Sequence, residues 1–115
     1  MENISYEDFK KLDMRLGRIL DAEAIAETDK LIKCKVSFGQ IGSGEEEVRT
    51  IVSGIREYFT PEEIIGKQVL YVLNLEPRMI RGVESRGMLM AVNGINGQVE
   101  FLVADGNVKD GANVR

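Results

Sequence analysis

The chain has 115 residues, of which 43% are apolar and 30% charged, and its net charge is −4. This length allows one domain with a modest core, so we expect a single domain over residues 1–115. One cysteine and no histidine exclude an internal disulfide, a Cys/His zinc cluster and an imidazole base. Because no apolar run approaches the ~20 residues that span a bilayer and the first residues lack a signal-peptide pattern, we expect a cytoplasmic protein with no membrane segment.

The N-terminal part predicts a short helix and then a strand. Ser5 and Asp8 have the spacing of a capping box, which favours one or two helical turns after Ser5. Residues 14–25 surround Gly17, which lowers helix propensity and is typical of a curved or bulged strand.

A second and a third strand follow, joined by a glycine-rich connection. Apolar and polar residues alternate over 31–38, which predicts a half-buried strand with a mostly basic face that includes Lys33 and Lys35. Residues 39–47, with three glycines and three glutamates, are expected to form a flexible hairpin connection. The strand after it covers 48–55.

The middle of the chain predicts a helical insertion between two strands. Thr60 and Glu63 form a second capping box around a first-turn proline, and Gly66 is a helix stop. The continuous apolar run over 68–75 then predicts a buried strand.

The last third predicts two more strands and a hairpin. Residues 87–92 are expected to form a buried strand, and the Asn-Gly pairs within 93–98 favour a hairpin that leads into a strand over 99–104. Five or six strands without strand–helix alternation indicate an all-β fold. We expect a small closed or nearly closed barrel, an OB-fold of five strands with short helices at the N-terminus and between strands.

Charge is unevenly distributed along this acidic chain. Three windows, at residues 10–18, 30–35 and 78–86, hold ten of the fifteen basic residues and two acids, whereas the rest holds five bases and seventeen acids. Local field rather than net charge decides where a polyanion binds, so a nucleic-acid surface is one interpretation. The other is a set of solvated charges scattered over the surface.

The segment around residues 81–88 carries no catalytic pattern. Gly82 stands three residues before Ser85, which is the wrong spacing for a nucleophile elbow, and no histidine exists to act as its base. We expect no enzymatic activity and no cofactor. Arg81 and Arg86 beside glycines suit phosphate binding, but a glycine-held turn with solvated arginines fits the residues equally well.

Five segments in order and spacing resemble the OB-fold tRNA-binding domain family, which occurs at the C-terminus of many methionyl-tRNA synthetases, as free-standing dimeric proteins, and in a cofactor of aminoacyl-tRNA synthetases. The resemblance covers nearly the whole chain and weakens after about Asn93. The five segments are LDMRLGRI, DKLIKCKVSFG, RTIVSGI, TPEEIIGKQVLYVLNLEP and RGVESRGMLMAV.

The resemblance implies recognition of tRNA by overall shape and a homodimer that pairs through C-terminal portions. The family motifs Asp-x-Arg-x-Gly, Asp-Lys-Leu and Ser-x-Gly-Met correspond to Asp13, Arg15 and Gly17, to Asp29, Lys30 and Leu31, and to Ser85, Gly87 and Met88. The Ser and Met of the last motif are associated with tRNA binding in that family. The candidate tRNA-binding residues, from the basic windows and these motifs, are Arg15, Lys30, Lys33, Lys35, Arg78, Arg81, Ser85, Arg86 and Met88.

The chain departs from the family pattern near Pro77. Glu76 and Met79 stand where many members have lysines, and Arg78 lies one place from the second of these positions. Neighbouring positions on a strand face opposite sides, so Arg78 need not replace that lysine, and weaker tRNA affinity is expected.

Two other functions remain open at this stage. A dimeric secretion chaperone resembles the same family, so the chain could bind polypeptides. It could also serve only to dimerise a larger synthetase. Nothing in the residues decides which tRNA is bound, or whether the synthetase partner is in cis or in trans.

Overall fold

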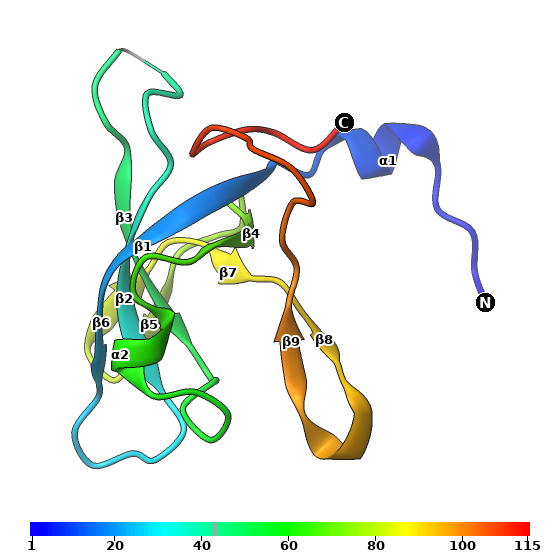
Figure 1. Cartoon of the computed structure of the whole chain (residues 1–115). Coiled ribbons are helices and arrows are strands. Elements are labelled where there is room, and N and C mark those ends of the chain that lie inside the picture. The colour runs from blue at the N-terminus through cyan, green and yellow to red at the C-terminus, as the bar shows by residue number, and fades with distance from the viewer. Residues whose placement is uncertain (43) are drawn as a thin grey trace.

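The computed structural model describes residues 1–42 and 44–115 as a strongly curved antiparallel sheet with short helices and two hairpins (Figure 1). Ser43, inside the predicted glycine-rich connection, lies outside the described residues. The elements in chain order are α1 (Tyr6–Lys10), β1 (Met14–Ala24), β2 (Ile32–Ser37), β3 (Val48–Ser53), α2 (Pro61–Ile64), β4 (Gln68–Val72), β5 (Arg78–Ile80), β6 (Val83–Ser85), β7 (Met88–Leu89), β8 (Ala91–Asn93), a 3₁₀ turn (Ile95–Gly97) and β9 (Val99–Phe101).

The main sheet has five strands in the order β3-β2-β1-β4-β7, and its two edges meet. The backbone N–H of Arg86 donates to the carbonyl of Thr50 at 3.0 Å. One residue earlier, the hydroxyl of Ser85 accepts a hydrogen bond from the backbone N–H of Val52 at 2.9 Å. The segment between β6 and β7 therefore joins β3 and nearly closes the barrel. The predicted OB-like, all-β fold is confirmed.

Alternation along β2 supplies much of the core. Ile32, Cys34 and Val36 are at most 2% exposed, whereas Lys33 and Lys35 between them face outward, as the period of a strand requires. Phe38 packs edge-on against Tyr71 with ring centroids 5.5 Å apart. The predicted half-buried strand is confirmed.

Cys34 is a free thiol inside this core. Burial, and secondarily the negative charge of Asp21, raise the pKa of the Cys34 thiol to about 12. The thiol therefore stays protonated at neutral pH and has the low reactivity of a structural cysteine.

The two predicted helix caps are present. The Ser5 hydroxyl accepts from the N–H of Asp8 at 3.0 Å, and Thr60 and Glu63 form a complete capping box at the start of α2. Ile64 of α2 is fully buried, whereas α1 buries none of its residues and projects from the barrel (Figure 1). Among the described residues, no helix is long and apolar enough to cross a membrane.

Strand β1 is curved and bulged, as predicted. Its register with β2 shifts between Ile19 and Asp21. A Cβ on Gly17 would lie 2.6 Å from the Phe38 ring and from Val36, so only glycine lets this strand pack so closely on the core.

The single buried strand predicted over residues 87–92 is wrong in part. It is divided into β7, in the main sheet, and β8, which pairs only with β9 and is exposed. Leu70 of β4 accepts from the N–H of Met90 at 2.9 Å but donates its own N–H to Leu102 at 3.0 Å. Because the chain returning after β9 takes the next place along β4, β8 turns away from the barrel. The predicted hairpin becomes β8–β9.

The C-terminal segment returns to the start of β1. Backbone bonds join Leu16 to Gly111 and to Ala112 at 2.6 and 3.0 Å. Gly111 has φ +89°, and a Cβ there would lie 2.0 Å from the carbonyl oxygen of Phe38. This crossing requires glycine for both its backbone conformation and its lack of a side chain.

We expect Gly111→Ala to lower the free energy of unfolding by about 2 kcal/mol or more, because the methyl group and the positive φ both oppose the native backbone. Gly106→Ala is the matched control, since a Cβ there meets no described atom within 4 Å. It should change stability by less than about 1 kcal/mol. Urea unfolding measures both, and equal stabilities would contradict the tight crossing.

Ser85→Ala should destabilise the barrel by about 1 to 3 kcal/mol, because it leaves the buried N–H of Val52 without an acceptor. Unfolding free energy and tRNA affinity should be measured on the same variant. A stable variant that has lost affinity would assign Ser85 to RNA contact instead of closure.

Candidate nucleic-acid interface

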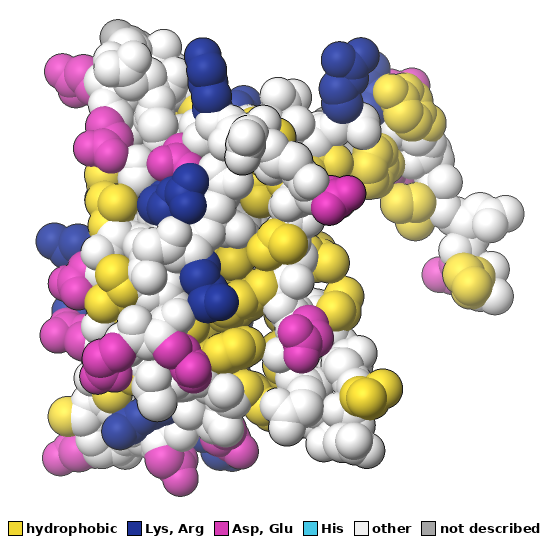
Figure 2. Space-filling model, in the orientation of Figure 1, with side chains coloured by type: hydrophobic (Ala, Val, Ile, Leu, Met, Phe, Trp, Pro, Cys, Tyr) yellow, Lys and Arg dark blue, Asp and Glu magenta, His cyan; other side chains and the backbone are white. Residues whose placement is uncertain are grey.

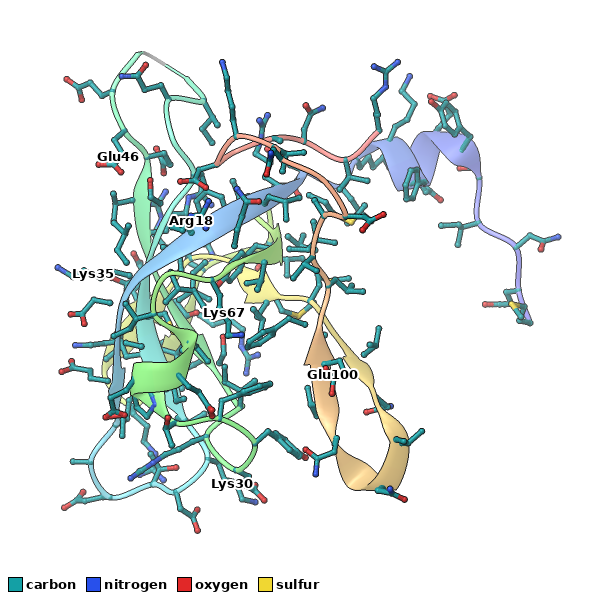
Figure 3. The ribbon with its side chains drawn as sticks, viewed as in Figure 1. Arg18, Lys30, Lys35, Glu46, Lys67 and Glu100 are labelled. Atoms are coloured by element: carbon teal, nitrogen blue, oxygen red, sulfur yellow. The ribbon has the colours of Figure 1, made fainter. Side chains whose placement is uncertain are left out.

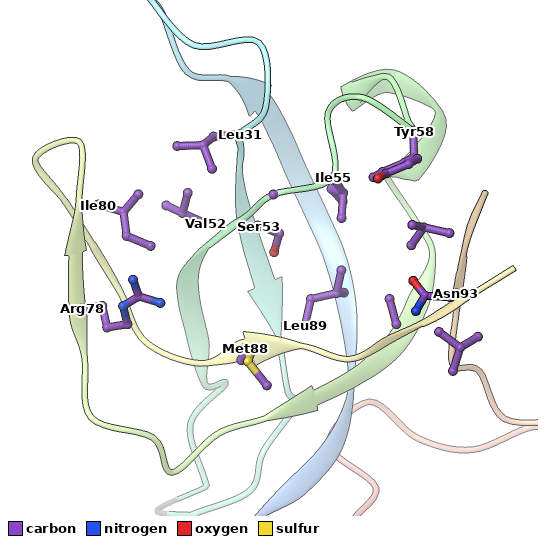
Figure 4. A pocket seen from close by; sticks show the side chains of 14 residues that line it. Leu31, Val52, Ser53, Ile55, Tyr58, Arg78, Ile80, Met88, Leu89 and Asn93 are labelled. Carbon is purple, nitrogen blue, oxygen red and sulfur yellow. The ribbon is translucent and has the colours of Figure 1, made fainter. Parts of the chain in front are cut away.

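A groove of about 510 Å³ lies between the β5–β6 hairpin, the end of β3 and strand β8 (Figure 4). Figure 2 shows apolar side chains gathered in the hollow between the barrel and the β8–β9 hairpin. The groove's own lining is mainly aliphatic, and its principal apolar side chains are Leu31, Val52, Ile80, Met88, Leu89 and Val92. These residues come from five separate segments, so only the folded chain forms the groove.

Arg78 is the only formally charged side chain among the described residues that line this groove. Tyr58 and Asn93 add a phenol ring and an amide (Figure 4). An apolar floor with a guanidinium and no lining carboxylate favours a ligand that carries negative charge next to an apolar or aromatic part.

The β5–β6 hairpin determines which arginine reaches the groove. Arg78 is paired with Ser85 across the hairpin, whereas Met79 is paired with Glu84 on the other face and is 68% exposed. The turn residues Arg81 and Gly82 both have positive φ, 52° and 79°, as a two-residue type I′ turn requires. The hairpin therefore puts Arg78 into the groove and holds Arg81 at its exposed tip.

The basic face of β2 lies one strand away from Arg86. Lys33 and Lys35 are in register with Val52 and Thr50 of β3, so these four side chains share one face of the sheet. Val52 lines the groove, and Thr50 holds Arg86 through its carbonyl group. Two strand spacings place the Cα atoms of Lys35 and Arg86 roughly 10 Å apart. Figure 3 shows Lys35 projecting outward from β2.

Acidic residues on β1 border this face. Nζ of Lys33 lies 2.7 Å from Oε1 of Glu23, and Asp21 is in register with Lys35. The exposed ion pair is weak and reduces the local field of Lys33 without removing its donors. The positive surface is therefore bounded on its β1 side.

Arg56 joins the site, although it lies outside the three basic windows of the sequence. Its backbone N–H donates to the carbonyl of Lys30 at 3.1 Å, and its guanidinium donates to the carbonyl of Thr28. The loop after β3 is thereby tied to the loop between β1 and β2, where Figure 3 shows Lys30. Arg56 lies between Ile55 and Glu57, outside the basic windows, so the local sequence did not indicate its contacts with Thr28 and Lys30.

Two of the candidate tRNA-binding residues, Arg15 and Ser85, make contacts within the protein. Arg15 is held by Asp13, with Nε 2.9 Å from Oδ1, and donates through Nη1 to the carbonyl of Gly111 at 2.9 Å. Ser85 is 4% exposed and closes the barrel. Their contact with tRNA stays a prediction. Met88, in contrast, is 48% exposed and lines the groove.

The first basic window does not join the other two. Lys10 and Lys11 lie on or next to α1, which projects on the side of the barrel away from β2, β5 and β6 (Figure 1). Arg18 pairs with Asp110 at 3.3 Å. The structure thus brings together the windows at 30–35 and 78–86 and adds Arg56 to them.

The arrangement provides binding groups for an anion. Among residues 1–42 and 44–115, no three His, Cys, Asp or Glu side chains gather as metal ligands. The guanidinium and ammonium groups around the groove donate hydrogen bonds and positive charge, which suits phosphate.

Residues 14–113 match the model of the family described as "Putative tRNA binding domain". The chain is 47% identical over 111 residues to the methionine–tRNA ligase of Flavobacterium johnsoniae, which covers 96% of this chain and 15% of that protein. It is also 47% identical over 116 residues to the ligase of Pyrococcus horikoshii, covering all of this chain and 15% of the relative. The chain therefore spans about 15% of the length of these curated relatives.

Solved structures agree over the full length. A MetRS-related protein from Pyrococcus horikoshii superposes with a TM-score of 0.88 at 40% identity, covering all of both chains. The CsaA chaperone protein from Picrophilus torridus has a TM-score of 0.84 at 27% identity, covering 98% of this chain and all of that one. The predicted resemblance is confirmed. Because the family model spans residues 14–113, which hold all the strands of the described part, the chain belongs to the tRNA-binding domain family.

Proposed function

We propose that this chain is a non-catalytic tRNA-binding module that works in the cytoplasm with methionyl-tRNA synthetase, either in cis or in trans. Family membership and the identity with methionine–tRNA ligases support the synthetase link. Likeness to a MetRS-related protein, at 40% identity and a TM-score of 0.88, supports the form in trans.

The observation that carries the proposal is the basic border of the groove. Arg78 lines the groove, and Arg81 is exposed at the tip of the adjacent β5–β6 hairpin. Lys30 and Arg56 are joined by a backbone hydrogen bond next to the lining residues Leu31 and Ile55. Phosphate contacts from these groups position a folded RNA without reading its sequence, which is how shape-directed binding works.

Acidic residues outside this border restrict where tRNA can bind. The chain has nineteen acids against fifteen bases, and the glutamates at 45–47 lie on the β2–β3 connection. A polyanion is repelled from such surfaces and attracted to the groove. The uneven distribution of charge thus favours one orientation of the bound RNA.

Binding of tRNA should weaken with salt, because each neutralised phosphate releases counterions. We expect log affinity to fall linearly with log salt concentration, with a slope of about −0.7 to −0.9 per phosphate contact. Fluorescence anisotropy with labelled tRNA measures the slope. An affinity that does not change with salt concentration, or no tRNA binding at low ionic strength, would contradict the proposal.

Arg81→Ala should cost about 1.5 to 3 kcal/mol of tRNA binding, or roughly 10- to 150-fold in affinity, if the guanidinium bonds a phosphate. Arg115→Ala removes the same charge at the C-terminus, near α1 (Figure 1), and is the matched control. If the two variants bind tRNA with equal affinity, the Arg81 guanidinium makes no phosphate contact and is only solvated.

The proposal extends to a homodimer. Large apolar side chains are exposed on the parts that project from the barrel, among them Tyr6 at 70%, Ile95 at 82% and Val103 at 65%. Family resemblance implies pairing through C-terminal portions, and these exposed side chains are available for such a contact. A second copy of the chain would cover them.

Light scattering during gel filtration should give twice the chain mass of 12.8 kDa. Val103→Glu should shift the protein toward the monomer, because it puts a charge into the buried contact. Met79→Glu, on the exposed face of β5, should not. A wild-type mass of one chain contradicts the dimer.

Polypeptide binding is the second candidate, favoured by the aliphatic lining of the groove and the 27% identity to a chaperone. The two functions predict opposite results when labelled tRNA is competed with an unfolded, basic polypeptide. Displacement only by tRNA supports the first, and displacement only by the polypeptide supports the second.

A further inference from the structure

The interior of the groove contains more than phosphate binding requires. Phosphate contacts need only the cations at its border, whereas the space of about 510 Å³ behind them is lined mainly by apolar side chains. We propose that this space receives an unpaired base of the bound tRNA, while the adjoining phosphate bonds to Arg78. The inference rests on the proposed tRNA-binding function and adds a base-accepting subsite to it.

Two planar groups stand on opposite sides of the groove. The ring of Tyr58, 41% exposed, lies on the loop after β3, and the guanidinium of Arg78 lies on β5 (Figure 4). Aromatic rings and guanidinium planes are the groups on which unstacked bases stack in RNA complexes. Leu89 and Met88 form the floor between them, which keeps a base away from water.

Polar groups in the lining can meet the edge of a base. The amide of Asn93 offers both a donor and an acceptor, and the Ser53 hydroxyl offers either. The volume lies within the range of roughly 300 to 1,000 Å³ found for small-ligand sites, so a single base fits with room for its sugar.

Charge favours an RNA base over an apolar polypeptide side chain. None of the lining residues in the described part of the chain is acidic, and Arg78 lies within the lining. Lys30 and Arg56 are held next to Leu31 and Ile55, which line one end. An entering chain therefore meets the Arg78 guanidinium beside an apolar floor with no lining carboxylate among the described residues, which matches a base next to a phosphate.

The expected consequence is a preference for RNA with unpaired nucleotides over fully paired RNA. A base inside a duplex is stacked and cannot enter the groove, whereas loops and single-stranded ends offer free bases. The groove would contribute affinity with little sequence selectivity, because every base has a face that can stack.

The test uses the full chain, labelled tRNA and two unlabelled competitors. One competitor is a short single-stranded RNA of mixed sequence, and the other is the same ribose–phosphate chain without bases. Both carry equal charge, so phosphate contacts alone predict equal competition. The groove predicts that the base-bearing strand competes about 5- to 100-fold better.

Two methionines give a matched pair of variants. Met88 lines the groove, whereas Met79 lies on the exposed face of the β5–β6 hairpin and does not line it. Met88→Ala and, independently, Tyr58→Ala should reduce the advantage of the base-bearing strand, whereas Met79→Ala should preserve it. Thermal unfolding checks that all three variants are folded.

Failure of this inference differs from failure of the proposed function. If intact tRNA binds with a steep salt dependence but the two competitors are equal, or the two methionine variants behave alike, the base site is overturned and tRNA binding remains. If no tRNA binds, both proposals fall. If Met88→Ala abolishes binding of an apolar peptide but leaves the preference for the base-bearing RNA strand unchanged, the groove binds polypeptides instead of a base.

Discussion

Closure of the barrel at β3 is the contact on which the rest of the molecule depends. At the free edge of β3, the Ser85 hydroxyl accepts from the N–H of Val52 and the N–H of Arg86 donates to the carbonyl of Thr50. The Arg49 guanidinium donates to the carbonyl groups of Arg86 and Leu73 at 3.3 and 2.8 Å. These bonds fix the end of the β5–β6 hairpin against the sheet. The hairpin in turn forms one wall of the groove and carries Arg78 and Arg81. A structural hydrogen bond network thus positions the basic side chains of the site.

The electrostatics follow from the same closure. Joining β6 to β3 brings the arginines of residues 78–86 within two strands of the lysines on β2. The carboxylates of Asp21 and Glu23 on β1 limit that positive area on one side. An acidic protein can therefore present a confined basic surface, while most of its carboxylates lie outside that surface. Salt screens such a surface, so its attraction for any anionic ligand decreases as ionic strength rises.

Local patterns predicted the fold well. The caps at Ser5 and Thr60, the alternation along β2 and the glycine in β1 all depend on neighbouring residues, and each formed as expected. The path after Leu89 could not be predicted this way, because it depends on Leu102 taking the next position along β4. The sequence predicted the site only as windows of basic residues. The structure adds Arg56 through a loop contact and excludes Lys10 and Lys11, which lie on or next to α1. The groove itself was not predictable, since Leu31, Ile80 and Val92 are distant in sequence and carry no shared pattern.

Gly87 has φ +141°, and a Cβ there would lie 3.0 Å from Ile51 and 3.2 Å from the carbonyl oxygen of Val72. Together with the buried Ser85, it leaves two side chains in the stretch 85–88, Arg86 and Met88, that point to solvent or the groove. Buried and exposed side chains therefore alternate residue by residue along this short segment. The exposed chemistry of Arg86 and Met88 can therefore vary without disturbing the buried contacts of Ser85 and Gly87, which hold the barrel closed.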